Sequence, residues 1–341
     1  MNTFATLPKQ QRADFFIRYN QRTEVDAVIV EKDFWVVWLL ARIFSIPELS
    51  DTAVFKGGTS LSKVFGAIAR FSEDIDLGIS PESLGWSEAT LTESSKNKWN
   101  EKLRPRLEAA CAARVQTGWL PRLEAEAGKL LGAPPAGRTW LRYELEEASH
   151  SPVIHFDYPS ALAGELAYIV RSVKMEFGSL ADQRPTGHHL ITAMIAELAP
   201  DAFADVGAQV VALEIERTFW EKATILHAEF HRLAAKPQPA RYARHYADFA
   251  ALWRHPAANA ARTQFELLAR VRQHKARFFA SGWAHYATAV PGTLRLLPPE
   301  SRWPELRSDY AAMLPMFMGE PLRFDEILAI LREAEQGINA S

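Results

Sequence analysis

The sequence has almost no cysteine, since Cys111 is the only one in 341 residues. A single cysteine cannot form an internal disulfide, so the fold does not depend on such crosslinks and a reducing cytoplasm is the expected environment. Cys111 lies in an alanine-rich stretch that is typical of a helix. No basic cluster in the sequence would lower the pKa of its thiol, so we expect it to be structural.

Long hydrophobic runs are missing as well. The longest one, Phe34 to Ala41, lies between Asp33 and Arg42 and is far shorter than the roughly 20 residues that span a bilayer. The segment from Met1 to Arg22 is polar and charged, without the apolar core of a signal peptide. We therefore expect a cytoplasmic protein with no membrane partner.

A large net charge is also absent, because the formal value is −2. The charge is nevertheless uneven between Arg241 and Ala280, where only Asp248 and Glu266 oppose eight basic residues. The eight are Arg241, Arg244, Arg254, Arg262, Arg270, Arg272, Lys275 and Arg277. A local surplus can bind a polyanion whatever the total charge, so this basic stretch is a candidate RNA path. The alternative is that these residues cap helices and pair with acidic residues such as Glu144, Glu146 and Glu147.

Hydrophobic periodicity predicts an α+β protein with two domains. Residues 1–210 are expected to form a mixed β-sheet flanked by helices, and residues 211–341 a helical domain. Strands are predicted at 53–56, 74–79, 139–146, 153–158, 168–177 and 210–213. Helices are predicted at 24–44, from Thr59 or Ser60 to about 65, as a hairpin over 95–132, and almost throughout from 214 onward.

A glycine turn follows the first predicted strand, in Lys56-Gly57-Gly58-Thr59-Ser60. Glycines allow a ligand to approach the backbone closely. The start of a helix offers free N–H groups that suit phosphate, and the two hydroxyls add possible donors. A plain turn with a Ser/Thr cap would have the same sequence, so the turn alone is a weak signal.

An acidic strand begins soon afterwards, in Ser72-Glu73-Asp74-Ile75-Asp76. Residues two apart on a strand share a face, so Asp74 and Asp76 are expected to project together while Ile75 faces the core. Two adjacent carboxylates repel each other unless a cation lies between them, and Mg²⁺ prefers oxygen ligands. An exposed acidic strand end is the alternative interpretation, which the preceding glycine turn disfavours.

These two motifs together resemble the signature of the AbiEii/AbiGii family of nucleotidyltransferase toxins. The matching segments are Lys56–Lys63 and Arg70–Leu77, at the family's spacing. Further segments resemble the family at Glu31-Lys32-Asp33-Phe34, Glu216–Ala223 and Arg241–Asp248. The resemblance implies the DNA polymerase β nucleotidyltransferase fold, with a helical C-terminal domain. It also implies a toxin of a type IV-like toxin–antitoxin or abortive-infection system for phage defence, with an antitoxin partner.

The resemblance also implies roles for individual residues. Gly57, Gly58, Thr59 and Ser60 would bind the triphosphate of the NTP. Asp74 and Asp76 would bind Mg²⁺ or Mn²⁺. Lys222 would contact the nucleotide phosphates, and Asp248 would assist catalysis or fix that lysine.

A third metal carboxylate is usual in the superfamily, on a later strand. Our candidate is Glu176, because alternation places it with Lys174 on the face opposite Val173 and Met175. Asp157 is the competing candidate, and a solvated pair at a sheet edge is the alternative. Aromatic residues near Lys222, among them Phe219 and Trp220, are expected to pack the core rather than stack on a base.

The expected reaction transfers a nucleoside monophosphate from an NTP to an acceptor hydroxyl. An RNA 3′ end, such as that of a tRNA, is the first choice of acceptor. A protein hydroxyl, as in AMP transfer, is the second. A toxin that binds a nucleotide without turnover is the alternative from another functional class.

Overall fold

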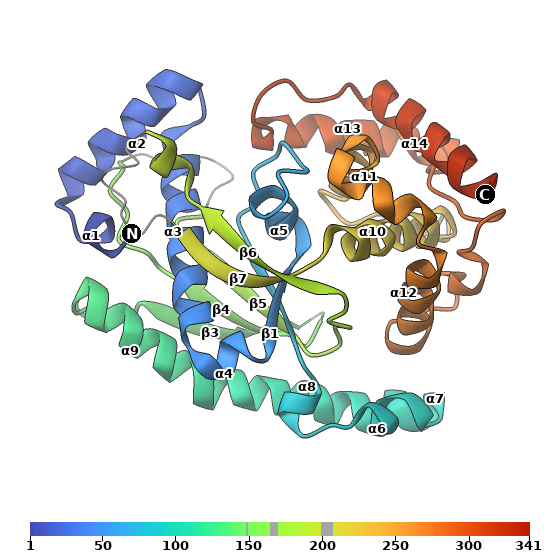
Figure 1. Cartoon of the computed structure of the whole chain (residues 1–341), viewed down its shortest axis with the longest axis horizontal. Coiled ribbons are helices and arrows are strands. Elements are labelled where there is room, and N and C mark those ends of the chain that lie inside the picture. Colours follow the sequence, from blue (N-terminus) through green and yellow to red (C-terminus); the bar gives the residue numbers. More distant parts are fainter. Residues whose placement is uncertain (148, 164–169, 199–206) are drawn as a thin grey trace. The chain divides into compact units, whose positions relative to one another are not determined.

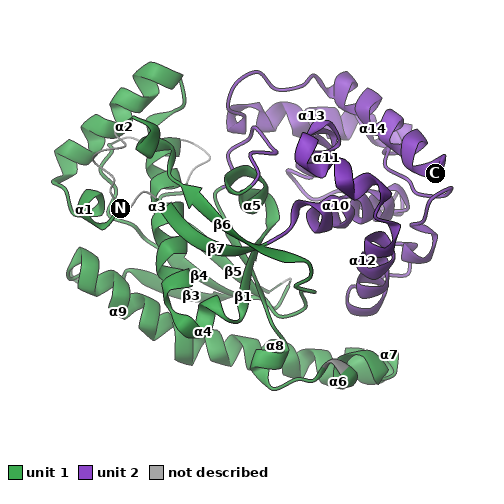
Figure 2. Ribbon diagram, viewed as in Figure 1, with its two compact units in different colours: residues 1–64, 73–212 green, residues 65–72, 213–341 purple. Residues whose placement is uncertain are grey.

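The computed structural model describes residues 1–147, 149–163, 170–198 and 207–341 (Figure 1). The chain forms two compact units (Figure 2). Unit 1 comprises Met1–Val64 and Glu73–Ala212, and unit 2 comprises Phe65–Ser72 and Leu213–Ser341. The chain therefore passes into unit 2 for eight residues between the glycine turn and the acidic strand, an excursion that the hydrophobic pattern does not reveal.

A seven-stranded mixed sheet forms the centre of unit 1, in the order β3-β4-β5-β2-β1-β7-β6. The strands are β1 Ala53–Lys56, β2 Ile75–Ile79, β3 Leu141–Leu145, β4 Pro152–Phe156, β5 Val173–Gly178, β6 Thr186–Thr192 and β7 Gly207–Leu213. β1 is antiparallel to β2 and parallel to β7, while β2 is parallel to β5. The sheet and its flanking helices confirm the α+β class.

Two details of the sheet differ from the sequence analysis. β6 was not predicted, because only Ile191 among its side chains is buried and the strand has no apolar alternation. The strand predicted over 168–177 is β5, whose first residue is Val173. Positions 168 and 169 of that prediction lie outside the described residues.

The helices of unit 1 surround this sheet. They are α1 Asn2–Ala5, α2 Lys9–Thr23, α3 Ala27–Ser45, α4 Pro47–Ser50, α5 Gly57–Lys63, α6 Glu88–Glu93, α7 Lys96–Lys98, α8 Arg104–Arg114 and α9 Leu120–Leu131. The central one is α3, which begins where the Asp26 side chain accepts a hydrogen bond from the Val28 N–H. All its residues from Val28 to Leu40 are buried, and its Trp38 ring stacks on Phe156 of β4 at 5.5 Å.

The predicted helical hairpin over 95–132 is wrong, because Lys96 to Leu131 form one continuous helix. Two π-helical segments, Trp99–Leu103 and Val115–Trp119, interrupt its α-helical winding. The buried side chains recur every fourth residue: Trp99, Leu103, Leu107, Cys111, Val115, Trp119, Leu123 and Ala127.

That spacing of four explains the π-helical segments. An α-helix has 3.6 residues per turn, so a stripe of period four would drift by about 40° at each step. The wider π-turns compensate for the drift and keep the stripe facing the sheet. Cys111 is fully buried within the stripe, and burial raises the pKa of its thiol to about 12. This agrees with the expected structural role.

Unit 2 is helical, as the sequence indicates. Its main helices are α10 Ile215–Phe230, α11 Ala243–Arg254, α12 Phe265–Phe278, α13 Trp303–Met313 and α14 Phe324–Asn339. Phe219 and Trp220 are fully buried, and the Phe219 ring lies 4.9 Å from that of Phe249. These aromatic side chains pack the core of unit 2, as predicted.

Backbone hydrogen bonds attach the excursion of residues 65–72 to unit 2. The Phe71 N–H donates to the Met316 carbonyl at 2.7 Å, and the Met318 N–H donates to the Ala69 carbonyl at 2.8 Å. Arg70, between them, forms a β-bridge with Phe317. The segment is thereby fixed as an added short strand of unit 2.

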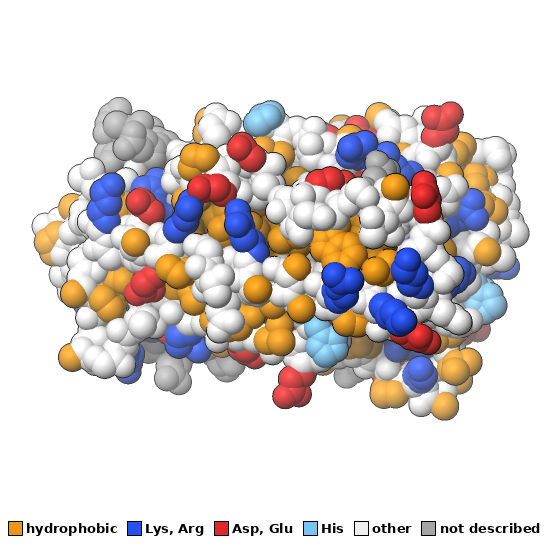
Figure 3. Space-filling model, turned by 90° about the horizontal axis from the view of Figure 1, so that it is seen from below, with side chains coloured by type: hydrophobic (Ala, Val, Ile, Leu, Met, Phe, Trp, Pro, Cys, Tyr) orange, Lys and Arg blue, Asp and Glu red, His pale blue; other side chains and the backbone are white. Residues whose placement is uncertain are grey.

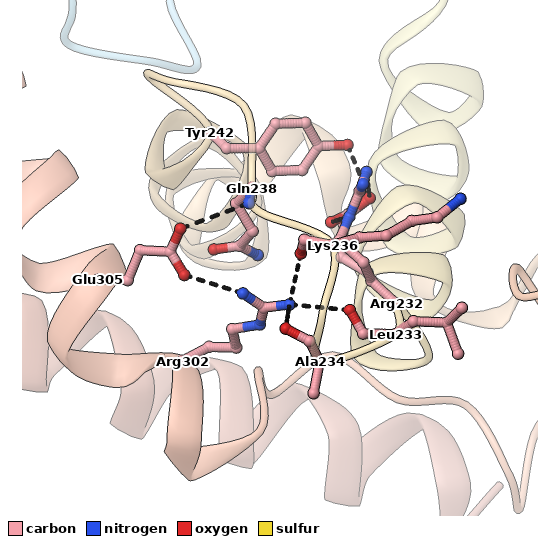
Figure 4. A network of polar contacts seen from close by, with 9 residues as sticks. Arg232, Leu233, Ala234, Lys236, Gln238, Tyr242, Arg302 and Glu305 are labelled. Atoms are coloured by element: carbon pink, nitrogen blue, oxygen red, sulfur yellow. Dashed lines mark hydrogen bonds and ion pairs between the residues drawn. The ribbon is translucent and has the colours of Figure 1, made fainter.

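The loop between α10 and α11 is anchored by one arginine (Figure 4). Arg302 donates to the carbonyls of Leu233, Ala234 and Lys236 at 3.1, 3.2 and 2.7 Å. It also donates to Glu305, whose other oxygen accepts from a backbone N–H of the same loop. These bonds satisfy carbonyls of the loop that follows α10 and attach this loop to Arg302 and Glu305.

Candidate active site

Acidic side chains meet on one face of the sheet in unit 1. The register pairs Asp76 of β2 with Lys56 of β1 on one side and with Glu176 of β5 on the other. Asp74 lies immediately before β2, two residues from Asp76, and the intervening Ile75 is fully buried. The structure therefore places Asp74, Asp76 and Glu176 on neighbouring strands of one face, as alternation suggests.

Asp74 and Asp76 have no neutralising partner of their own. Neither side chain accepts a hydrogen bond or forms an ion pair within the part of the chain that the structure describes. The pKa of Asp74 is raised to about 6, first by burial and then by the charges of Glu73 and Asp76. Lys32 and Lys174 oppose that rise only in part. A pair of like charges in such a place is suited to a bound cation.

The glycine turn lies directly against this carboxylate pair. Gly57 has a φ of 84°, which a side chain would strain. A Cβ at Gly57 would lie 2.0 Å from Oδ2 of Asp76. Glycine is therefore required both by the backbone conformation and by the close approach of Asp76, so the turn and the acidic strand form one site.

The two hydroxyls of the turn are engaged in the fold. Thr59 and Ser60 are fully buried. The Thr59 hydroxyl donates to the backbone carbonyl of Asp74, and the Ser60 hydroxyl donates to the carbonyl of Gly57 at 3.0 Å. They were predicted to bind the triphosphate, yet here their hydroxyls hold the turn and the acidic strand together. What the turn offers a phosphate is its backbone N–H groups, which the first turn of α5 leaves without intrahelical acceptors.

Glu176 and Asp157, the two candidates for a third carboxylate, differ in place and in partners. Glu176 lies beside Asp76 in the register and accepts from Lys174 at 3.4 Å. Asp157 follows β4 and forms a bidentate ion pair with Arg142, with N···O distances of 2.6 and 3.0 Å. The register thus favours Glu176 as the neighbour of the aspartate pair.

Asp74, Asp76 and Glu176 fit a divalent cation in the chemistry of their donors. All three are oxygen donors, and hard cations take oxygen ligands. As the side chains stand, no group of three potential metal ligands converges on one point within the described ranges. Glu176 is turned toward Lys174, so it would have to exchange that partner for a metal ion.

Lys222 and Asp248, the two site candidates of unit 2, are bound to each other. The Lys222 ammonium donates to Oδ2 of Asp248 at 2.7 Å and lies 3.2 Å from Nδ1 of His245. Arg70 donates to the same carboxylate, through Nε to Oδ1 at 2.7 Å and through Nη2 to Oδ2 at 2.9 Å. Lys222, Asp248 and Arg70 are all at least nine-tenths buried.

Electrostatics in this cluster follow from its composition. Burial opposes ionisation of Asp248, but Arg70 and Lys222 together hold its pKa far below the ordinary value. Burial lowers the pKa of Lys222, and Asp248 offsets part of that effect. Burial beside Lys222 also lowers the pKa of His245, which is therefore a neutral acceptor. An ammonium has three N–H donors, so two bonds leave Lys222 one for another acceptor.

Arg70 is a member of this cluster that sequence reasoning missed. Its partner Asp248 is 178 positions away in sequence, and no periodicity connects the two. The available signal was the family-like segment that begins at Arg70. His227 is a local hydrogen-bonding residue: its Nδ1 accepts from the Arg295 N–H at 3.0 Å, and burial lowers the pKa of His227 to about 4.

The basic stretch of unit 2 is partly committed to the fold. Arg254 pairs with Glu333, Arg262 lies 4.0 Å over the Trp253 ring, and Lys275 donates to a backbone carbonyl. Glu144 and Glu146, the partners considered from sequence, bond instead to His155 and Lys174 of unit 1. On the face drawn in Figure 3, basic and acidic side chains lie intermixed.

The sequence matches one family of known proteins. The family model described as "Nucleotidyl transferase AbiEii toxin, Type IV TA system" matches residues 38–330. MenT4, a nucleotidyltransferase toxin from Mycobacterium tuberculosis H37Rv, is 13% identical over 90% of this chain and 99% of its own. The TM-score of 0.37 is too low for that likeness to carry an argument. No curated protein matches the chain. Among the described helices, none is long and apolar enough to cross a membrane.

Proposed function

The chain belongs to the AbiEii family of nucleotidyltransferase toxins of type IV toxin–antitoxin systems, and on that premise we propose that it transfers a nucleoside monophosphate to the 3′ end of an RNA with the help of Mg²⁺. Membership implies nucleotidyltransferase activity, an NTP as substrate and an antitoxin as partner. The metal, the acceptor and the residue roles are our proposal.

The single observation that carries the proposal is the unpaired aspartate pair beside the glycine turn. Asp76 lies where a Gly57 side chain would otherwise be, so a phosphate held by the turn's N–H groups would lie beside two carboxylates. Phosphate and carboxylate repel each other, and a divalent cation between them removes the repulsion. This arrangement suits an NTP bound together with its metal.

In the proposed reaction, the acceptor oxygen forms a bond to the α-phosphorus while the bond from that phosphorus to the β-phosphate oxygen breaks. Pyrophosphate leaves, and the proton of the acceptor hydroxyl passes to solvent. Mg²⁺, when bound, lowers the pKa of the acceptor hydroxyl and stabilises the leaving group. Asp74, Asp76 and Glu176 would hold it, while the turn orients the phosphates.

Lys222 is proposed to contact the nucleotide phosphates, with Asp248 and Arg70 fixing its ammonium. Two of its three N–H groups are accounted for by Asp248 and His245, and the third is the one that would donate to a phosphate oxygen. A buried and oriented ammonium loses little conformational freedom on binding, which favours this role.

An RNA acceptor is preferred because the exposed members of the basic stretch, such as Arg241 and Arg270, can neutralise phosphates. The test incubates the protein with each α-labelled NTP in turn, with total RNA and with protein extract. Label in RNA that depends on Asp76 supports the proposal. Label in protein would point to an NMP-transferase acting on proteins. No label in either, with NTP binding intact, would point to a nucleotide-binding toxin without turnover.

A further inference from the structure

Helix α3 carries three consecutive charged residues in its buried part. The exposed fraction of the whole residue is 0% for Glu31, 2% for Lys32 and 1% for Asp33. Burying a charge is costly unless it is paired and hydrogen-bonded. Each member of this charged triplet should therefore have a partner, and the partners show what the triplet does.

The outer two residues of the triplet, Glu31 and Asp33, each accept a hydrogen bond from a backbone N–H group. Asp33 also forms an ion pair with helix α5. Glu31 accepts from the Ala161 N–H at 2.5 Å, in the segment after β4. Asp33 accepts from the Met194 N–H at 2.7 Å and pairs with Lys63, the last residue of α5. α3 is thereby connected to the helix that follows Gly57.

The central residue holds the acidic strand. Lys32 donates to Oε2 of Glu73 at 2.5 Å and to the Val170 carbonyl at 2.9 Å. Glu73 directly precedes Asp74. Because neighbouring side chains of an extended chain point to opposite sides, drawing Glu73 toward α3 directs Asp74 away from it. The Thr59 hydroxyl holds the Asp74 carbonyl from α5, so both the side-chain direction and the backbone of this residue are constrained.

We propose that Lys32 is a positioning residue for the metal-binding carboxylates, acting through Glu73. It anchors Glu73 on the helix side of the sheet and so presents Asp74 beside Asp76 on the other side. This inference rests on the proposed function, since it assumes that Asp74 and Asp76 bind the metal. It adds a residue, 42 positions before Asp74, that touches neither metal nor nucleotide.

Three roles for Lys32 predict different effects of Lys32→Met on metal binding. Positioning predicts weaker binding, because Asp74 is no longer directed into the site. A purely electrostatic role predicts tighter binding, because a nearby positive charge has been removed. A purely structural role predicts a lower melting temperature with unchanged metal affinity and unchanged kcat of the folded protein.

The experiment titrates Mn²⁺ into the full-length protein, follows free Mn²⁺ by EPR, and measures kcat at saturating NTP. For Lys32→Met we expect a Mn²⁺ dissociation constant raised at least threefold and kcat lowered at least tenfold. Lys32→Arg, which keeps the charge and the donors, should restore most of both. Tighter or unchanged Mn²⁺ binding by Lys32→Met would overturn the proposal.

A double variant guards against simple misfolding. Lys32→Met with Glu73→Gln removes both charges, so no carboxylate is left at position 73 without its partner. Positioning predicts that this variant melts higher than Lys32→Met, yet binds Mn²⁺ and turns over as poorly. Recovery of normal affinity and kcat would show that Lys32 only neutralises Glu73, and would also overturn the proposal.

Two further variants complete the design. Arg122→Met breaks an ion pair with Glu48 between α9 and α4 of the same unit and should leave both measurements unchanged. Asp76→Ala should abolish Mn²⁺ binding at the site. If Asp76→Ala binds Mn²⁺ normally, the proposed function has failed at its metal site. If Asp76→Ala loses the metal and Lys32→Met does not, only the positioning role has failed.

Discussion

Burial favours the neutral acid both at Asp74 in unit 1 and at Asp248 in unit 2, yet the pKa values of these two carboxyls shift in opposite directions. Burial, and then the like charges of Glu73 and Asp76, raise the pKa of Asp74 to about 6. Asp248 is gripped by Arg70 and Lys222, so its pKa falls far below the ordinary value. Partners, and not burial, decide whether a buried carboxylate is neutralised within the fold or requires a cation from outside.

The two regions therefore have different roles in the protein. In the cluster of Arg70, Lys222 and Asp248 the carboxylate is neutralised within the fold, so the cluster should contribute to stability and to the orientation of Lys222. The pair of Asp74 and Asp76 is incomplete and should contribute to activity at a cost in stability. Substitutions in the two regions should therefore have separable effects.

The largest effect is expected on activity in unit 1. Asp76→Ala should lower the transfer rate by on the order of 10³-fold, or about 4 kcal/mol of transition-state stabilisation. The physical reason is the loss of a ligand to the metal that stabilises the leaving group. Initial rates with labelled NTP measure the effect, and circular dichroism checks that the fold is retained. Normal turnover by a folded Asp76→Ala protein would remove Asp76 from the site.

The next effect is expected on stability in unit 2. Asp248→Asn leaves two buried cations without their anion, which should destabilise the protein by about 3–5 kcal/mol. Thermal unfolding by calorimetry measures the change, with Asp325→Asn as a control because its ion pair with Arg307 lies at the surface. An Asp248→Asn protein that melts with the parent would show that the cluster is not a stabilising unit.

Lys222→Met should have a smaller effect on stability, about 1–3 kcal/mol, because Asp248 keeps its two bonds to Arg70. Its NTP dissociation constant should nevertheless rise about tenfold or more, because a charge-assisted bond to phosphate is lost. Equilibrium binding of a labelled NTP measures this change. Lower stability with unchanged NTP affinity would make Lys222 a structural residue only.

The smallest effect is expected from two arginines of the basic stretch, the exposed Arg270 and the half-buried Arg272. Contact with four phosphates of a single-stranded RNA would give a slope near −3 for the logarithm of the binding constant against that of salt. The pair of substitutions Arg270→Gln and Arg272→Gln should flatten this slope by about 1 to 2 and leave NTP affinity unchanged.

A matched control replaces two other arginines, which form ion pairs at the surface. Arg254 and Arg307 of the same unit are paired with Glu333 and Asp325, so their replacement by Gln should change the slope less. Equal slopes for the two double variants, or RNA transfer that is independent of salt, would shift the preference to a protein acceptor.

Local patterns predicted much of the site in unit 1. The strand at 53–56 and the common face of Asp74 and Asp76 follow from alternation, and the register places Glu176 beside them. These features depend on neighbours in sequence or on strand period, which a single sequence contains. Metal binding by Glu176 itself stays a prediction.

Features set by long-range packing could not be predicted. Arg70 binds Asp248 across 178 positions, and Lys32 binds Glu73 across 41. The Thr59 hydroxyl proved to be a donor to the acidic strand because α5 packs against it. The continuous helix of 96–131 was missed because its apolar stripe has a period of four, which matches no regular helix.

The central claim is that Asp74 and Asp76 form a cation site, and the most direct test is the melting temperature of Asp74→Asn against that of the parent. The folded pKa of Asp74, about 6, exceeds its ordinary value of 3.8, so ionised Asp74 destabilises the metal-free protein above pH 6 and this penalty fades as the pH falls from 6 to 4. In EDTA at pH 8, Asp74→Asn should melt a few degrees higher than the parent, and the difference should fall to about half at pH 5 and approach zero below about pH 4. Mg²⁺ at pH 8 should raise the melting temperature of the parent and leave that of Asp74→Asn almost unchanged. A variant that melts lower than the parent at pH 8, or an equal response of both proteins to Mg²⁺, would contradict the account.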